Sequence, residues 1–234
     1  MRVFANRTAA GQALAQRLLD KRYADPVVLA LPRGGLPVAA EVARALGAPL
    51  DLVLVRKVGL PWQPELAVGA VVDGERPEFV VNEATRNLVE AHPETFAGIE
   101  ARELREIERR RRLYLKDRPR ARIAGATAIV VDDGLATGAT ARAALKALRR
   151  QRPAKLVLAV PVAPPDTLAA LAPEADEIVC LEAPDPFHAI GEFYRDFGQL
   201  DDAEVQRYLA AFPVSGPATS PAGGPRQSDG GAAR

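Results

Sequence analysis

Two adjacent carboxylates, Asp132 and Asp133, followed by a loop of small and hydroxyl residues at 134–140, are the part of the sequence best suited to chemistry. The apolar run 128–131 precedes them and predicts a short buried strand. Apolar residues then recur at helical spacing over 143–148 and predict a helix after the loop. A strand, an acidic pair, a tight loop and a helix would thus follow one another within about twenty residues.

This arrangement favours an anion-binding site. The loop points backbone N–H groups and the positive end of the helix dipole at one spot, which suits a phosphate. Thr137 and Thr140 can add hydroxyl donors, and the acidic pair lies at a strand's carboxyl end, where open α/β sheets bind ligands. No Lys-Ser or Lys-Thr closes the loop, so it is not a Walker A loop, and the dinucleotide fingerprint G-x-G-x-x-G is absent.

The stretch Val-Val-Asp-Asp-Gly-x-Ala-Thr-Gly-Ala-Thr closely resembles the phosphoribosyl pyrophosphate (PRPP) motif of the type I phosphoribosyltransferases. The alternative is an ordinary Asp-Asp-Gly turn at a strand end. The resemblance implies that Asp132 and Asp133 take the ribose hydroxyls and contact magnesium. It also implies that the 5′-phosphate is bound by the loop residues Ala136, Thr137, Gly138, Ala139 and Thr140.

A second loop, Pro32-Arg33-Gly34-Gly35, follows the apolar run 27–31. Its glycines allow a close backbone approach to a ligand, and Arg33 supplies positive charge. The next predicted strand, 50–55, ends at Arg56-Lys57. Taken alone, these are a plain turn and a surface lysine. The resemblance implies instead a pyrophosphate loop with Gly34, Gly35 and Arg33, and a basic position at Lys57 that reaches the pyrophosphate.

Transfer from PRPP breaks the bond between the anomeric carbon and pyrophosphate, so charge develops on the ribose ring and on the leaving group. The resemblance therefore implies a magnesium-dependent transferase of nucleotide salvage, with magnesium arriving on PRPP and a nitrogenous acceptor, expected to be a nucleobase. Family members that use 6-oxopurines have an Asp where this chain has Ala136, which disfavours guanine and hypoxanthine. A PRPP-sensing regulator on the same fold, or another phosphate-sugar enzyme, remains an alternative.

The surrounding elements predict an α/β fold. Short apolar runs alternate with helical patterns, which is typical of right-handed crossovers and a mostly parallel five-stranded sheet with helices on both faces. The predicted strands are 27–31, 50–55, 128–131, 156–161 and 177–181. We expect one domain over 1–212 and a disordered tail over 213–234, where Pro, Ser, Gly and Ala dominate.

Two segments interrupt or follow that alternation. An insert at about 58–122 contains a predicted hairpin, which resembles the start of the flap that closes over PRPP, and a charged helix at 94–116. The arginine run 109–112 in this helix could meet phosphate or nucleic acid. Pairing with nearby Glu residues along a solvated face is favoured, so nucleic acid is not an expected partner. The segment 184–212 resembles a family hood, where Phe187, Phe193 and Tyr194 could stack on a base but more often form core.

The composition of the chain limits the partners, disulfide bonds and cellular location that can be expected. The chain has 234 residues, 48% of them hydrophobic, and a net charge of +1, which does not indicate a general nucleic-acid surface. Its one cysteine, Cys180, excludes an internal disulfide and reads as a small buried hydrophobe. There is no apolar run of membrane-spanning length and no secretory signal, so we expect a cytoplasmic protein. We also expect a homodimer.

Overall fold

The computed structural model describes residues 2–60, 63–74, 77–116 and 118–212. Its centre is a five-stranded parallel sheet in the order β2-β1-β6-β7-β8. The strands are β1 Pro26–Ala30, β2 Leu50–Leu52, β6 Thr127–Val131, β7 Lys155–Val162 and β8 Glu177–Glu182. The predicted α/β fold with a parallel five-stranded sheet is confirmed, and the predicted disordered tail lies outside the described residues.

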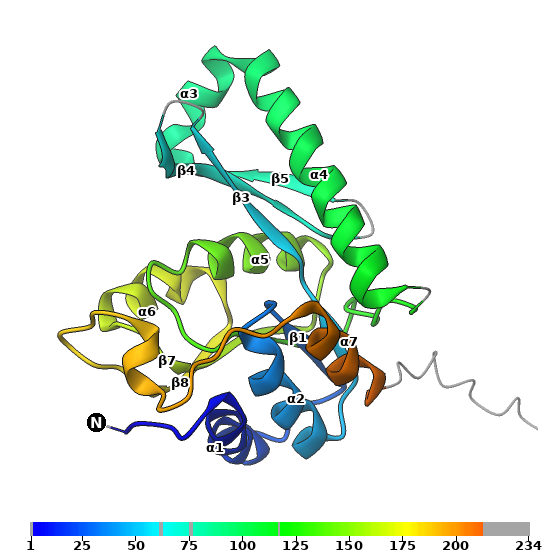
Figure 1. Ribbon diagram of the computed structural model, residues 1–234, viewed down its shortest axis with the longest axis vertical. Helices are drawn as coiled ribbons and strands as arrows, with labels where there is room; N and C mark the ends of the chain where they lie inside the picture. Colours follow the sequence, from blue (N-terminus) through cyan, green and yellow to red (C-terminus); the bar gives the residue numbers. More distant parts are fainter. Residues whose placement is uncertain (1, 61–62, 75–76, 117, 213–234) are drawn as a thin grey trace, which may run out of the picture.

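Helices cover both faces of this sheet, as predicted (Figure 1). Strand side chains alternate between the faces, and two separate apolar clusters result. Val28, Ile129 and Val157 pack with α1 and α2, whereas Leu29 and Val130 pack with α5. The helices are α1 Arg7–Leu19, α2 Gly35–Leu46, α5 Ala139–Arg150 and α6 Pro165–Leu171.

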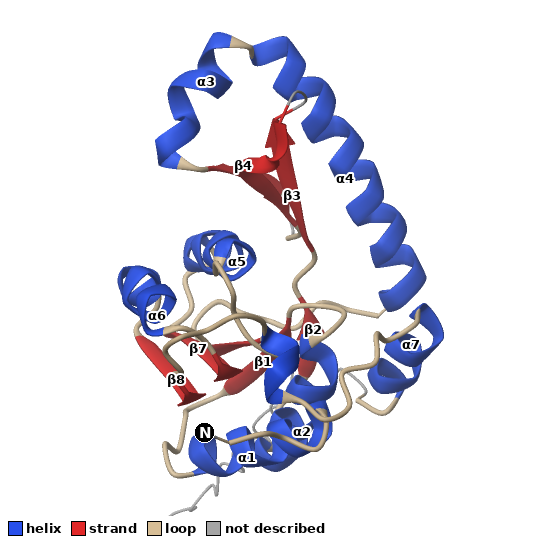
Figure 2. Ribbon diagram, turned by 60° about the vertical axis from the view of Figure 1, so that its left-hand side comes forward, coloured by secondary structure: helices blue, strands red, loops and turns tan. Residues whose placement is uncertain are grey.

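The insert stands away from the sheet as an arm (Figures 1 and 2). A three-stranded antiparallel sheet in the order β3-β4-β5 packs against the long helix α4, and the arm also contacts α5. Its elements are β3 Val55–Leu60, β4 Gln63–Val72, β5 Glu78–Val81, the 3-10 turn η1 Glu83–Thr85, α3 Arg86–Ala91 and α4 Pro93–Leu115. The predicted hairpin and long helix are therefore both present.

One predicted strand is wrong in its extent. The run 50–55 is two strands, since β2 ends at Leu52 and Val55 already begins β3 of the arm. Arg56 and Lys57 consequently lie inside a strand of the arm, not at the end of a strand of the central sheet. An apolar run can pass through a change of sheet without any break in its pattern, which is why the sequence concealed the boundary.

Ion pairs occupy the charged face of α4. Arg109 and Arg110 both contact Glu106, at 2.8 and 2.7 Å, and Arg112 pairs with Glu108. These pairs have the three- and four-residue spacing expected on a helix surface. The described contacts therefore favour the interpretation in which the arginines of α4 pair with its Glu residues on a solvated face, over the one in which they bind phosphate. A further arginine of the arm, Arg56, contacts the buried carboxylate of Glu103 at 2.8 Å and fastens β3 to α4.

The C-terminal segment returns over the core. It contains η2 Ala172–Glu174, η3 Ile190–Phe193 and the closing helix α7 Asp202–Ala210, which contacts α2 and α4. The aromatic residues of the predicted hood are mainly core: Phe193 and Tyr194 are 1% and 6% exposed, and Phe187 stacks on Phe193. Phe197 is more exposed, at 37%, but its ring stacks on Tyr194 with centroids 5.0 Å apart.

Candidate functional site

Two loops meet at the carboxyl end of the central strands. β1 and β6 pair in parallel, and Leu31 N–H donates to the carbonyl of Val131 at 2.9 Å just beyond them. The chain then turns into α2 after β1 and into α5 after β6. Because parallel neighbours end at one edge, the Arg33 loop and the Asp132-Asp133 pair are brought together, as the sequence predicted.

The contact between these loops requires glycine. A Cβ atom at Gly34 would lie 2.1 Å from Asp133 Oδ2, and one at Gly35 would lie 2.7 Å from the carbonyl oxygen of Val131. A side chain at Gly35 would meet backbone and push the loops apart, whereas one at Gly34 would displace the Asp133 carboxylate from its place beside Arg7. The peptide bond between Pro32 and Arg33 is cis.

The two aspartates have different surroundings. Asp133 is 8% exposed, and its Oδ2 accepts a hydrogen bond from Arg7 Nε at 2.7 Å. Its backbone carbonyl accepts a hydrogen bond from the hydroxyl of Tyr194 at 2.5 Å. Asp132 is partly exposed, and its Oδ1 accepts from the N–H of Asp133 at 2.9 Å. The implied task of Asp133, to take ribose hydroxyls and magnesium beside Asp132, therefore meets a carboxylate that is buried and already paired with Arg7.

Burial also shifts the titration of this pair. Burial raises the pKa of Asp132 well above its usual range, and the neighbouring Asp133 carboxylate adds to the effect. Burial raises the pKa of Asp133 as well, although the hydrogen bond from Arg7 opposes it. A cation delivered to Asp132 would relieve the repulsion between the two carboxylates and favour its ionised form.

Arg7 is a functional candidate that sequence reasoning missed, whereas Tyr194 was considered there only as a ring that could stack on a base. Arg7 also donates to the carbonyl of Gly198 at 2.7 Å, and its guanidinium lies 3.9 Å from the ring centre of Phe197. It thus ties the N-terminal helix, the hood and Asp133 together. No local pattern marks an arginine whose partner lies 126 positions away, so only the fold reveals this role.

The loop before α5 has the form expected of a phosphate cradle. Gly138 has a left-handed backbone with φ of 69°, and no side chain caps the helix that begins at Ala139. The first-turn N–H groups of α5 therefore have no intrahelical acceptor. The hydroxyl of Thr167 on α6 donates to the carbonyl of Ala136 at 2.6 Å and holds the loop in place. Thr137 is exposed beside these N–H groups.

The two predicted cationic residues do not sit at neighbouring strand ends. Arg33 follows β1, and its guanidinium is 3.6 Å from the carboxylate of Asp202 on α7. Lys57 lies on β3 of the arm, exposed, and lines a cavity of about 330 Å³ together with Thr137 and Ala139. Lys57 therefore borders the phosphate loop from the arm, and its predicted contact with the pyrophosphate stays a prediction.

A magnesium ion held only by protein is not indicated. The described residues contain no group of three or more His, Cys, Asp or Glu side chains that could hold a metal. Asp132 is a single accessible oxygen ligand, since Arg7 occupies Asp133. This donor set fits an ion that reaches the site with most of its ligands supplied by a phosphorylated substrate and water.

Comparison with known proteins shows the family. The model of the phosphoribosyl transferase domain matches residues 4–197, so the chain belongs to the phosphoribosyl transferase family. The crystal structure of TT1426 from Thermus thermophilus is 42% identical with a TM-score of 0.76, and the match covers 91% of this chain and 99% of that chain. No helix in the described ranges has the length and apolarity needed to span a membrane.

Two Mycobacterium tuberculosis proteins, from strains CDC 1551 / Oshkosh and H37Rv, are 46% identical to this chain over 209 residues. Each is named "Putative phosphoribosyl transferase". The match covers 89% of this chain and 47% of each relative, so the chain spans about half the length of the curated relatives it matches.

Proposed function

We propose that this chain transfers the 5-phosphoribosyl group from PRPP to a nitrogenous acceptor, with release of pyrophosphate. The observation that carries the proposal is the packing of the Arg33 loop directly on the acidic pair, with Gly34 against Asp133 and Gly35 against Val131. A loop that is suited to a pyrophosphate and a loop that is suited to a 5′-phosphate thereby flank the acidic pair. Family membership and the uncapped start of α5 support it.

In this proposal each residue has a defined task. The N–H groups from Thr137 to Thr140 hold the 5′-phosphate, and Asp132 accepts hydrogen bonds from the ribose hydroxyls. Asp133 holds the Arg33 loop and the acidic pair in place through its hydrogen bond with Arg7, and Asp132 contacts the ligand. Magnesium, when bound with PRPP, would neutralise charge on the pyrophosphate, and Asp132 is the residue that would contact it.

Cations at the leaving group complete the site. Arg33 is held by a long 3.6 Å contact to Asp202, so its guanidinium can turn toward an incoming pyrophosphate at little cost. Lys57 enters from the arm, beside Thr137. Bringing the arm closer to the sheet would exclude water, which would otherwise hydrolyse the activated sugar. A nucleobase acceptor other than a 6-oxopurine fits Ala136 at the loop.

The test is PRPP-dependent release of pyrophosphate across adenine, guanine, hypoxanthine, uracil and orotate, with magnesium present. We expect turnover with at least one acceptor and its loss in Asp132→Asn. Arg105→Gln is a matched control, because Arg105 is an exposed arginine of α4 outside the site. Tight PRPP binding without turnover on any acceptor would favour the alternative, a PRPP-sensing regulator. Absence of PRPP binding would contradict both.

A further inference from the structure

The carboxylate of Asp202 is shared between the Arg33 loop and the arm. One of its oxygens, Oδ1, accepts a hydrogen bond from the hydroxyl of Tyr114 at 2.6 Å. The same oxygen lies 3.6 Å from Nη1 of Arg33. Tyr114 belongs to α4 of the arm, Asp202 begins α7, and Arg33 lies in the loop between β1 and α2. Three segments that are distant in the sequence therefore meet at one oxygen atom.

The surroundings of Asp202 hold its carboxylate in place. Asp201 caps α7 through a capping box, which orders the turn that carries Asp202. Tyr114 is 6% exposed, and burial raises the pKa of its hydroxyl, as does the hydrogen bond to Asp202. The hydroxyl therefore stays protonated and donates. The side-chain amide of Gln206 on α7 also donates to the carbonyl of Leu113 on α4 at 2.8 Å, which fastens the two helices together.

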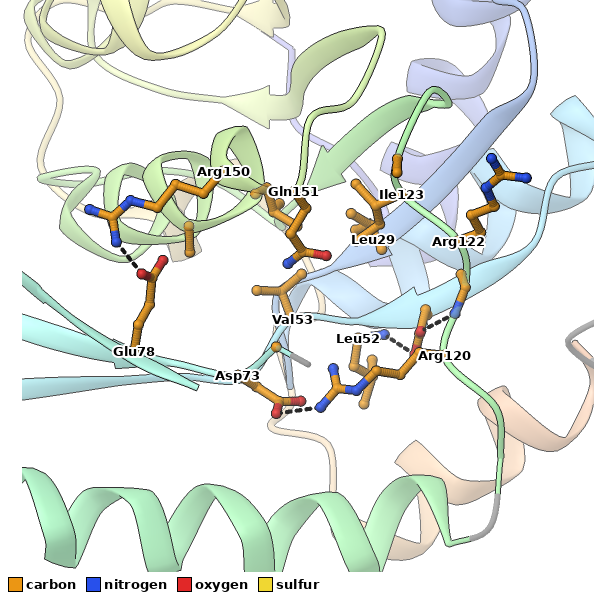
Figure 3. Close-up of a pocket in the computed structure, with 16 residues that line it drawn as sticks. Leu29, Leu52, Val53, Asp73, Glu78, Arg120, Arg122, Ile123, Arg150 and Gln151 are labelled. Carbon is orange, nitrogen blue, oxygen red and sulfur yellow. Dashed lines mark hydrogen bonds and ion pairs between the residues drawn. The ribbon is translucent and has the colours of Figure 1, made fainter. Parts of the chain in front are cut away.

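The base of the arm is attached to the core in turn. Asp73, which follows β4, pairs with Arg120 at 2.6 Å, and Glu78 of β5 pairs with Arg150 of α5 (Figure 3). The end of α4 lies beside α7 at this base (Figure 1). This end of α4 consequently has little freedom to follow a side chain that moves in the site.

Arg33 is bound to the carboxylate less firmly. The distance of 3.6 Å exceeds that of a hydrogen bond, and the side chains of Arg33 and Asp202 are 34% and 47% exposed, so the attraction is mainly one of charge. Arg109 and Arg110, on the same part of α4 as the tyrosine, both contact Glu106. Among the ion pairs of the described residues, Arg33 and Asp202 each have only the other as a partner.

Given the proposed function, on which this inference rests, we propose that Asp202 is a positioning residue that competes with the pyrophosphate of PRPP for Arg33. One guanidinium charge compensates either the carboxylate or the pyrophosphate. The carboxylate is fixed by Tyr114, whereas the pyrophosphate enters and leaves. Arg33 turns from Asp202 to PRPP when PRPP binds, and it returns to Asp202 when pyrophosphate departs. Asp202 thereby weakens the binding of pyrophosphate and favours its release.

The experiment is calorimetric titration of the full chain and of Asp202→Asn with three ligands, each with magnesium: PRPP, inorganic pyrophosphate and ribose 5-phosphate. Asparagine keeps a carbonyl that accepts from Tyr114 but loses the charge that attracts Arg33. We expect PRPP and pyrophosphate to bind the variant about two- to fivefold more tightly, the factor that corresponds to an exposed ion pair. Ribose 5-phosphate has no pyrophosphate, so it should bind both proteins equally.

The matched control is Asp20→Asn, the same chemical change at an exposed carboxylate. Asp20 follows the last residue of α1, at the opposite end of that helix from Arg7, so this variant should bind all three ligands as the parent does. Circular dichroism verifies that both variants fold. In steady-state assays, Asp202→Asn should lower the KM for PRPP by the factor seen in calorimetry, without a rise in kcat.

A double-mutant cycle tests whether Asp202 acts through Arg33. In an Arg33→Ala background, Asp202→Asn should leave the affinity for PRPP unchanged, because the cation for which the two anions compete is gone. An equal gain in both backgrounds, an equal gain with ribose 5-phosphate, or unchanged or weaker binding of PRPP by Asp202→Asn would overturn the inference and leave the proposed transfer intact. Failure of the parent to bind PRPP would overturn both.

Discussion

Replacing Arg7 by Met should expose how strongly the fold depends on one ion pair. The side chains of Arg7 and Asp133 are each 11% exposed, and their atoms are 2.7 Å apart. Removing one member of a nearly buried pair leaves an uncompensated charge and costs about 3 kcal/mol or more. For a chain of this length, that corresponds to a melting temperature lower by roughly 6–12 °C. Methionine keeps most of the aliphatic stem, so the loss reflects charge more than volume.

The sign of the pH dependence follows from Asp133. Its pKa is already raised by burial, and without Arg7 it rises further. An acid whose pKa is higher in the folded than in the unfolded state destabilises the fold as pH rises above the unfolded value of about 3.9. The deficit of Arg7→Met relative to the parent should therefore be larger at about pH 8 than at about pH 5. Asp132 is present in both the parent and Arg7→Met, so its contribution to the pH dependence of stability largely cancels in the comparison.

Urea unfolding at the two pH values measures this difference. A double-mutant cycle with Asp133→Asn isolates the pair, because Arg7→Met should cost much less when residue 133 is already neutral. Arg105→Gln serves as the control for loss of one arginine. A deficit that is the same at both pH values, or a coupling energy below about 0.5 kcal/mol, would refute the reasoning.

Three further predictions concern the site and the sheet. Arg33→Ala and Lys57→Ala should each lower turnover about 100-fold while changing the dissociation constant of PRPP only a few-fold, and equal losses in kinetics and calorimetry would mean that these residues only bind. Transfer to guanine or hypoxanthine should be inefficient because Ala136 replaces an acid, and efficient transfer in the acceptor panel would contradict this. Two lysines lower the pKa of Glu177 to about 2. The contacts of Glu177 with the two lysines therefore stabilise the fold above the ordinary pKa of 4.5, and this stabilisation is lost as pH falls toward 2. In acid titrations followed by circular dichroism, Glu177→Gln should be less stable at neutral pH by about 1 kcal/mol, a gap that closes in acid.

Local patterns were sufficient to predict the sheet and its helices. Gly47, for instance, ends α2 in a left-handed conformation, as a glycine after an apolar helix predicts. The phosphate loop before α5 could also be predicted, because its small residues and its helix are continuous in the sequence.

Long-range contacts were not predictable. Asp132 and Asp133 look equivalent in the sequence, yet Arg7 and Tyr194 both donate hydrogen bonds to the second of them. Lys57 follows an apolar run that spans two sheets, so its place on the arm depends on where the chain leaves β2. Such differences arise from packing between distant segments, which no single window of residues contains.

The position of the arm in the chain has a consequence for biosynthesis. Each residue of β1 pairs with one 101 positions later in β6, because the arm is inserted between these two central strands. Closing so long a loop has a modest cost in stability but slows the search for the native pairing. At roughly 5–20 residues per second, a ribosome needs about 5–20 s to make β6 after β1. During that interval the apolar edge of β1 has no native neighbour on its β6 side, and a nascent chain in this state is a natural client for chaperones.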